Sequence, residues 1–150
     1  MSPGLVFVDT TVLLYAVDDR EPAKREQARH WLSTCWQWRC GRLSTQVLNE
    51  FYWNALRRFG TNVSRDDAQA WVRRYQQWRP WQVDFATVET AWAVESRYGL
   101  AYWDALMVAA ARHQACGFLL SEDLQHDQLL DGVRVLNPFT VGPSVLDTPA

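Results

Sequence analysis

The sequence has little lysine, no strong excess of charge and no long apolar run. Lys24 is the only lysine, and 15 Lys and Arg residues stand against 17 Asp and Glu, for a net charge of -2. This balance lacks the strongly basic character of a general nucleic-acid binder, so any such binding depends on local patches. No apolar run approaches the roughly 20 residues that span a bilayer, and the N-terminus does not resemble a signal peptide. We therefore expect a cytoplasmic protein without membrane contact.

Several kinds of site are also missing from the sequence. The three cysteines, Cys35, Cys40 and Cys116, have no metal-ligand spacing, which fits a reduced interior. The histidines do not pair with a cysteine or serine in a way that indicates nucleophilic or zinc chemistry. There is no glycine-rich phosphate loop.

Short apolar segments alternate with helical patterns along the 150 residues. This alternation predicts a single α/β domain, a three-layer α/β/α sandwich around a central, mainly parallel five-stranded sheet. The first strand has no polar alternation, which is typical of a strand buried on both faces. We expect a core over about 5–139, a peripheral tail over 140–150, and strands at 5–8, 42–46, 81–84, 117–121 and 133–137.

Four acidic residues fall near the expected ends of strands. Asp9 ends the first strand and Asp123 follows the fourth, while Glu50 and Asp104 lie early in helices. Asp104 directly precedes 105–111, an apolar helical run whose composition predicts burial. Because ligands of open parallel sheets bind at the carboxyl ends of the strands, we expect the four acids to converge there.

Clustered carboxylates repel one another, so their proximity requires compensation. A divalent cation is the usual remedy, and Mg²⁺ or Mn²⁺ prefers oxygen ligands. Such ions support hydrolysis at phosphate groups. Each acid alone also has a structural explanation: Asp9 is a natural helix N-cap, Ser121 could cap likewise, the helix dipole favours Asp104, and Glu50 fits a solvated face.

Four motifs together resemble the PIN-domain ribonucleases, and most closely the VapC-type toxins of toxin–antitoxin pairs. The motifs are "VFVDTTVLLYAVD", "LSTQVLNEFY", "YWDALMVAAA" and "LLSEDLQH", in that order. The similarity covers roughly residues 5–139. One departure is Thr11, where many relatives carry Asn: its hydroxyl can form hydrogen bonds but does not offer the separate donor and acceptor of an amide to a water molecule beside Asp9.

The resemblance implies a PIN-like fold and a Mg²⁺- or Mn²⁺-dependent endoribonuclease that leaves 5′-phosphate and 3′-hydroxyl ends. Its metal ligands would be Asp9, Glu50, Asp104 and Asp123, assisted by the small polar groups of Thr10 and Ser121. It further implies a homodimer, an RNA substrate such as tRNA, rRNA or mRNA, and a small antitoxin protein that blocks the acidic site.

Two other classes of function remain open. The first is a catalytically inactive PIN-like module that only binds a protein partner. The second is a phosphatase or phospho-acceptor that uses Asp9 as a nucleophile, and it fits poorly. The best-known phosphatases need a second Asp where Thr11 stands, and a receiver domain needs a late lysine that this chain lacks.

Overall fold

The computed structural model of the protein describes residues 4–147, in which five short strands form one sheet. The sheet has the order β2-β1-β3-β5-β4, and every neighbouring pair is parallel except β4 and β5. This arrangement confirms the prediction of a mainly parallel five-stranded sheet. The strands are β1 (Val6–Val8), β2 (Gly41–Arg42), β3 (Phe118–Leu120), β4 (Leu129–Leu130) and β5 (Val133–Leu136).

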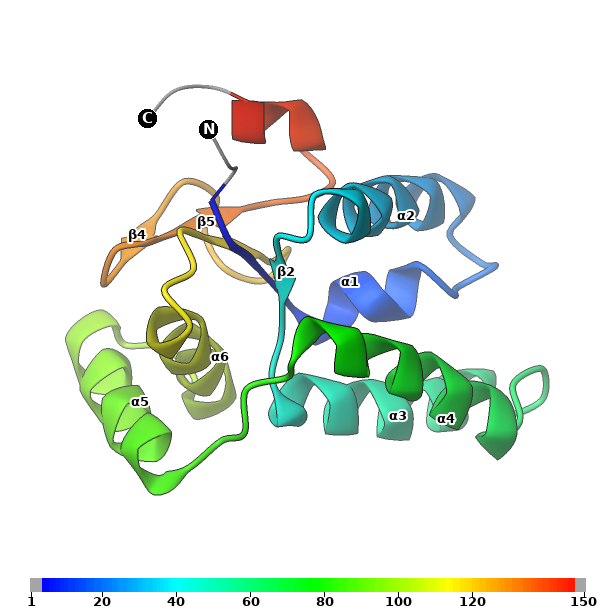
Figure 1. Ribbon diagram of the computed structural model, residues 1–150, viewed down its shortest axis with the longest axis horizontal. Coiled ribbons are helices and arrows are strands. Elements are labelled where there is room, and N and C mark those ends of the chain that lie inside the picture. The colour runs from blue at the N-terminus through cyan, green and yellow to red at the C-terminus, as the bar shows by residue number, and fades with distance from the viewer. Residues whose placement is uncertain (1–3, 148–150) are drawn as a thin grey trace.

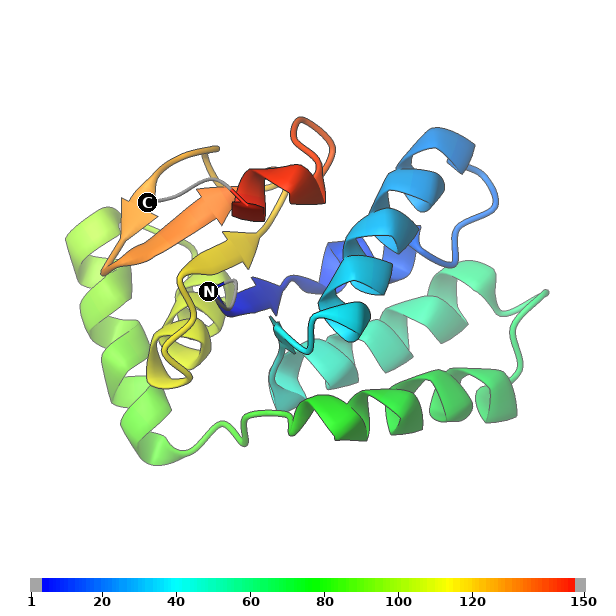
Figure 2. The same ribbon diagram turned by 45° about the horizontal axis from the view of Figure 1, so that its top comes forward.

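Helices cover both sides of the sheet and complete the predicted sandwich. Helices α5 and α6 lie on one side, and α2 with η2 lies on the other, while α3 and α4 extend away from the strands (Figures 1 and 2). No helix within residues 4–147 combines the length and apolar character needed to cross a membrane. The helices are α1 (Thr10–Tyr15), α2 (Pro22–Gln37), α3 (Thr45–Phe59), α4 (Arg65–Arg74), η1 (Tyr75–Trp78), α5 (Phe85–Tyr98), α6 (Tyr102–His113) and η2 (Pro143–Asp147).

Two predicted strands are wrong in position. The strand expected at 42–46 ends at Arg42, because the Ser44 hydroxyl accepts the Val47 N–H at 3.3 Å and α3 begins at Thr45. The strand expected at 81–84 is reduced to one bridge between Ser44 and Trp81.

The fifth strand of the observed sheet is instead β4, which pairs with β5 in an antiparallel hairpin. Asp131 and Gly132 form its turn at φ angles of 50° and 88°. Asp-Gly is a typical sequence for such a two-residue turn.

The core is built around the apolar run of α6. Each of its residues from Ala105 to Ala111 is at most 5% exposed, which confirms the burial that their composition predicts. The tail expected to be peripheral forms η2, where Leu146 is buried and the helix packs against α2. Residues 148–150 lie outside the described part of the chain.

Gly41 is required where the start of β2 meets an aromatic cluster. A Cβ at this position would lie 2.5 Å from the indole of Trp78. That indole is held by Trp36 and Tyr75, with ring centroids 5.0 and 4.9 Å away. The indole therefore has little room to move, and β2 can pack against it only because Gly41 has no side chain.

We expect Gly41→Ala to lower the free energy of unfolding by about 1–3 kcal/mol, because overpacking of a rigid core forces side chains or backbone to shift. Chemical denaturation would measure the change. Gly117→Ala is the matched control, since a Cβ there meets nothing within 4 Å. Equal stability of the two variants would contradict the argument.

Candidate active site

The four acids lie where β1 and β3 end side by side. Asp9 follows β1 and caps α1, while Asp123 follows β3. Strands β1 and β3 are parallel neighbours, and the chain crosses to opposite sides of β1 when it forms β2 and β3. Such a topological switch point is where open α/β sheets place their ligands. Glu50 reaches the same region from α3 and Asp104 from the first turn of α6.

Asp9 is the most buried of the four, with only 3% of its surface exposed. Its carboxylate accepts the Ser121 hydroxyl at 3.0 Å and the Thr11 N–H at 3.4 Å. Burial is the main reason that the pKa of Asp9 rises to about 7, and the charges of Asp123 and Asp104 add to the rise. The predicted N-cap role and a place in the acidic cluster therefore coexist in one residue.

Ser121 connects the ends of the two strands. Its hydroxyl donates to Asp9 and accepts the backbone N–H groups of Asp123 and Leu124 at 3.2 and 3.3 Å. The hydroxyl therefore fixes the orientation of the Asp9 carboxylate and the course of the chain at Asp123.

Glu50 is half-buried and held by two side chains. The Thr10 hydroxyl lies 3.5 Å from its Oε1, and the Gln46 amide donates to the same oxygen at 3.1 Å. Burial is the main cause of its raised pKa, and the Asp104 charge contributes. Gln46 also donates to the carbonyl oxygen of Trp103 at 3.1 Å, which ties Glu50 to the start of α6.

Asp104 completes the electrostatic coupling among the acids. Desolvation is the main cause of its raised pKa, and the charge of Asp123 raises the pKa further. Since Asp104 also raises the pKa of Asp9 and of Glu50, all four carboxylates belong to one interacting group. The solvated-face explanation for Glu50 does not fit a half-buried carboxylate with two hydrogen-bond donors.

The donor set fits a hydrated divalent cation. Carboxylate and hydroxyl oxygens are the ligands that Mg²⁺ and Mn²⁺ prefer. Within residues 4–147, no three His, Cys, Asp or Glu side chains lie close enough to ligate one ion directly. Mg²⁺ commonly keeps several waters and uses only one or two carboxylates together with substrate phosphates, so this spacing suits it.

Two buried polar atoms beside the acids give independent support for this fit. The hydroxyl of Thr11 and the Oε1 atom of Gln46 have no hydrogen-bond partner, the only such buried side-chain atoms in residues 4–147. Thr11 follows the capping residue Asp9 by two positions, and Gln46 donates to Glu50. Buried polar groups are rarely left without a partner, so both oxygens are expected to accept or donate a hydrogen bond to water.

Comparison with known families places the chain by sequence. The family model for the PIN domain matches residues 6–130. The chain belongs to the PIN domain family. The fold of this PIN-domain chain is similar to VapC20 of Mycobacterium tuberculosis, a toxin that cleaves the sarcin-ricin loop, with a TM-score of 0.57 at 21% identity. The match covers 79% of this chain and 89% of VapC20. No curated protein matches the sequence.

Two residues that support the acids were not identified from the sequence. Gln46 stands four residues before Glu50, a spacing that places both on one face of a helix and could have identified it. Lys24 in α2 forms an ion pair with Glu122 at 2.8 Å. This contact ties the segment that contains Asp123 to α2, and nothing in the sequence spacing indicates it.

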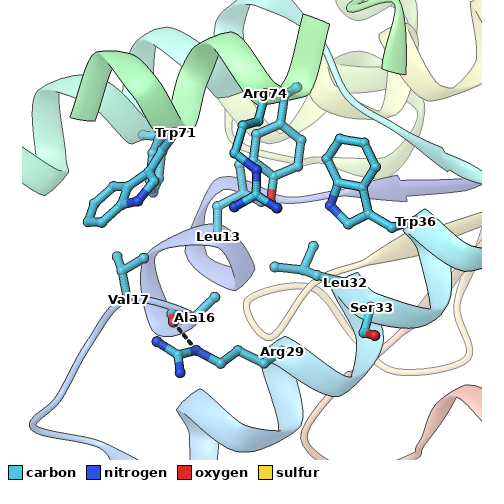
Figure 3. A pocket seen from close by; sticks show the side chains of 11 residues that line it. Leu13, Ala16, Val17, Arg29, Leu32, Ser33, Trp36, Trp71 and Arg74 are labelled. Carbon is cyan, nitrogen blue, oxygen red and sulfur yellow. Dashed lines mark hydrogen bonds between the residues drawn. The ribbon is translucent and has the colours of Figure 1, made fainter. Parts of the chain in front are cut away.

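One cleft lies apart from the acids. Its volume is about 490 Å³, and it opens between α1, α2 and the α4–η1 segment. Trp36, Trp71 and Leu13 line it, and the guanidinium groups of Arg29 and Arg74 point toward it (Figure 3). None of the four acids lines this cleft. Among them, only Glu50 lines a described groove, of about 470 Å³ between α3 and α6.

Asp9→Asn should stabilise the metal-free protein, because it removes a buried charge that neighbouring carboxylates repel. We expect the free energy of unfolding in EDTA to rise by about 1–3 kcal/mol. Mn²⁺ should raise the Tm of the wild type and leave that of Asp9→Asn nearly unchanged. Thermal unfolding with and without Mn²⁺ measures both effects. The control is Asp66→Asn, which makes the same exchange at an exposed position in α4 and should behave as the wild type. An Asp9→Asn variant that is less stable than the wild type in EDTA would refute the argument.

Proposed function

We propose that this PIN-domain protein is a divalent-metal-dependent endoribonuclease that leaves 5′-phosphate and 3′-hydroxyl ends. The observation that carries the proposal is the electrostatic coupling of four carboxylates at the β1/β3 switch point. Such a group is unfavourable without a cation, and a cation among carboxylates suits phosphodiester hydrolysis. Family membership supports the same reaction.

The residues proposed to hold Mg²⁺ or Mn²⁺ are Asp9, Glu50, Asp104 and Asp123, one or two of them directly and the others through water, since no three potential ligands in residues 4–147 lie within direct reach of one ion. Such an ion, when bound, acts as a Lewis acid beside the phosphate and lowers the pKa of water at the site. The protein supplies the carboxylates and fixes their orientation. In the metal-free protein the pKa of Asp9, Glu50 and Asp104 is raised chiefly by burial, and a bound cation would relieve this cost by favouring the charged form.

Thr10 and Ser121 act in this proposal as positioning groups. Ser121 holds the Asp9 carboxylate in one orientation, and Thr10 does so for Glu50. Gln46 is a third positioning residue, because it holds Glu50 from the other side. Fixed carboxylates reduce the reorganisation that accompanies charge development on phosphate.

We propose that the nuclease is the toxin of a toxin–antitoxin pair and acts in the cytoplasm on tRNA, rRNA or mRNA. The similarity in fold to VapC20, a toxin that cleaves the sarcin-ricin loop, supports this role. Its partner would be a small antitoxin protein that blocks the acidic site. A structured ribosomal RNA is the first substrate to test.

A homodimer is the proposed assembly. Large apolar side chains are exposed around the groove between α3 and α6, including Trp53 at 64% and Trp103 at 62%. Phe85, at 67%, follows Val83, which lines the same groove. Exposed apolar patches of this kind commonly mark protein interfaces. Pairing here would bring the acidic sites of two protomers near the interface, since Glu50 also lines the groove.

The second candidate is a catalytically inactive PIN-like module that binds a protein partner. Its support is that no three potential ligands in residues 4–147 lie within direct reach of one ion. The two candidates differ in one assay: a pure binding module shows no Mn²⁺-stimulated cleavage that is lost when an acid is replaced.

Asp104→Asn should abolish RNA cleavage while the fold is retained. We expect the cleavage rate to fall by more than about 100-fold, because losing a group that merely orients a metal ligand already costs 10–100-fold. The assay follows Mn²⁺-dependent cleavage of ribosomal RNA and sequences the new 5′-phosphate ends. Toxicity on expression should disappear as well.

The matched control is Asp66→Asn, which removes an exposed carboxylate from the first turn of α4. It should cleave at the wild-type rate, and thermal unfolding should show that both variants are folded. Full activity of Asp104→Asn, with normal metal dependence, would refute the assignment of the site.

Trp53→Asp should convert the dimer into a monomer, because a charge replaces an apolar group at the centre of the proposed interface. Light scattering coupled to size-exclusion chromatography measures the mass. Trp38→Asp is the control: Trp38 is 37% exposed but lies at the end of α2, outside this groove. A wild-type protein that is monomeric at high concentration would contradict the proposed assembly.

A further inference from the structure

Three arginines gather in a groove that the acidic site does not use. Arg39, Arg42 and Arg79 line this groove of about 410 Å³, together with Trp36 and Trp78. No Asp or Glu lines it. None of the three guanidinium groups forms an ion pair with a carboxylate within residues 4–147. In a protein with a net charge of -2, this is a concentrated local excess of positive charge.

The arginines are attached to fixed backbone. Arg42 belongs to β2, and its Nη1 donates to the carbonyl oxygens of Gly41 at 2.8 Å and Arg39 at 3.4 Å, while its Nε and Nη2 donate to no group within residues 4–147. Arg39 and Arg79 follow the ends of α2 and η1 in left-handed conformation, with φ angles of 54° and 51°. Glycine is the usual residue at such helix ends.

The aromatic side chains of the groove are largely covered. Trp78 is only 5% exposed, and the half-buried Trp36 packs 5.0 Å from it, with the Arg74 guanidinium 5.9 Å from its ring. The arginines therefore supply the contacts, and guanidinium groups bind phosphate through paired N–H donors. An RNA strand presents a row of phosphates to the three arginines.

The groove lies at the opposite end of the strands from the acids. Gly41 pairs with Val6, the first residue of β1, while Asp9 follows its last residue, Val8. Three strand residues span roughly 10 Å. Because β1 is buried, an RNA molecule held at the acids would reach the arginines only around the edge of the sheet, with phosphates several nucleotides away from the cleaved bond.

We propose that Arg39, Arg42 and Arg79 form a second RNA-binding site that holds the phosphate backbone of the substrate. The inference rests on the proposed ribonuclease function. The site contributes affinity without taking part in the chemistry, and it binds independently of any divalent ion.

The test measures binding of a fluorescent ribosomal RNA hairpin in EDTA, so that no cleavage occurs. The variant Arg39→Gln/Arg42→Gln/Arg79→Gln should bind the RNA at least about tenfold more weakly at 50 mM salt. The magnitude of the slope of log K against log salt concentration should fall by about 2–3, because each lost phosphate contact lowers it by about 0.7–0.9. Arg134→Gln, an exposed arginine on β5, should change neither quantity measurably. Unchanged affinity and slope in the triple variant would overturn the proposal.

Arg39→Gly/Arg79→Gly separates binding from folding. Glycine adopts the left-handed conformation freely, so this variant should unfold at the same Tm as the wild type or higher and still bind RNA more weakly. If the triple Arg→Gln variant and the double Arg→Gly variant both bind RNA more weakly and both have a lower Tm, the loss of binding is due to folding and the proposal is overturned.

Inorganic phosphate distinguishes the two sources of phosphate. If inorganic phosphate binds the wild type more tightly than the triple variant while both bind RNA equally, the groove is assigned to a free phosphate and the RNA site is overturned. Loss of RNA affinity in the triple variant assigns the groove to the RNA backbone. Mn²⁺-dependent cleavage by the same variants is measured separately. Cleavage by the wild type with unchanged RNA binding in the triple variant refutes only this inference. Absence of cleavage with a clear loss of binding refutes only the nuclease.

Discussion

The buried carboxylate of Asp9 is the constraint on which the site depends. Its pKa of about 7, against an ordinary value of 3.8, corresponds to about 4 kcal/mol of unfavourable interaction with the charged form. Because Asp9 also caps α1, the carboxylate cannot turn away without losing the contact that starts the helix. This is the net cost, because the hydrogen bond from Ser121 already lowers the pKa. It explains why a cation is expected here.

The sequence predicted the parts of the fold that depend on local composition. The continuous apolar runs at β1, β3 and α6 leave no alternative to burial, and these elements appear where expected. The failures fall at the ends of the sheet. At 42–46, the Ser44 cap outweighed an apolar pattern too short to decide between strand and helix. At β4, the strand is only two residues long, so it gives no periodic signal, and the turn at Asp131 and Gly132 is the only local sign of a hairpin.

The candidate site was predictable in its acids but not in the groups that hold them. Four acids near strand ends follow from the rule for parallel sheets, because topology alone brings those ends together. The contacts of Gln46 with Glu50, and of Lys24 with Glu122, depend on how helices pack. Lys24 also lies 4.8 Å from the ring centroid of Tyr15, an environment that joins residues from α1, α2 and the segment after β3. No single stretch of sequence contains that information.

The two ends of the strands carry opposite charge, and the short strands set the distance between them. Carboxylates gather after β1 and β3, while arginines gather before and within β2. Exposed charges are screened over about 8–10 Å at physiological salt, close to the length of a three-residue strand. The arginines therefore cannot neutralise the acids, and a polyanion at the acidic end still needs a cation there. Under the two proposals, RNA binding at the arginines and cleavage at the acids are electrostatically separate, so replacing arginines and replacing acids should affect different steps.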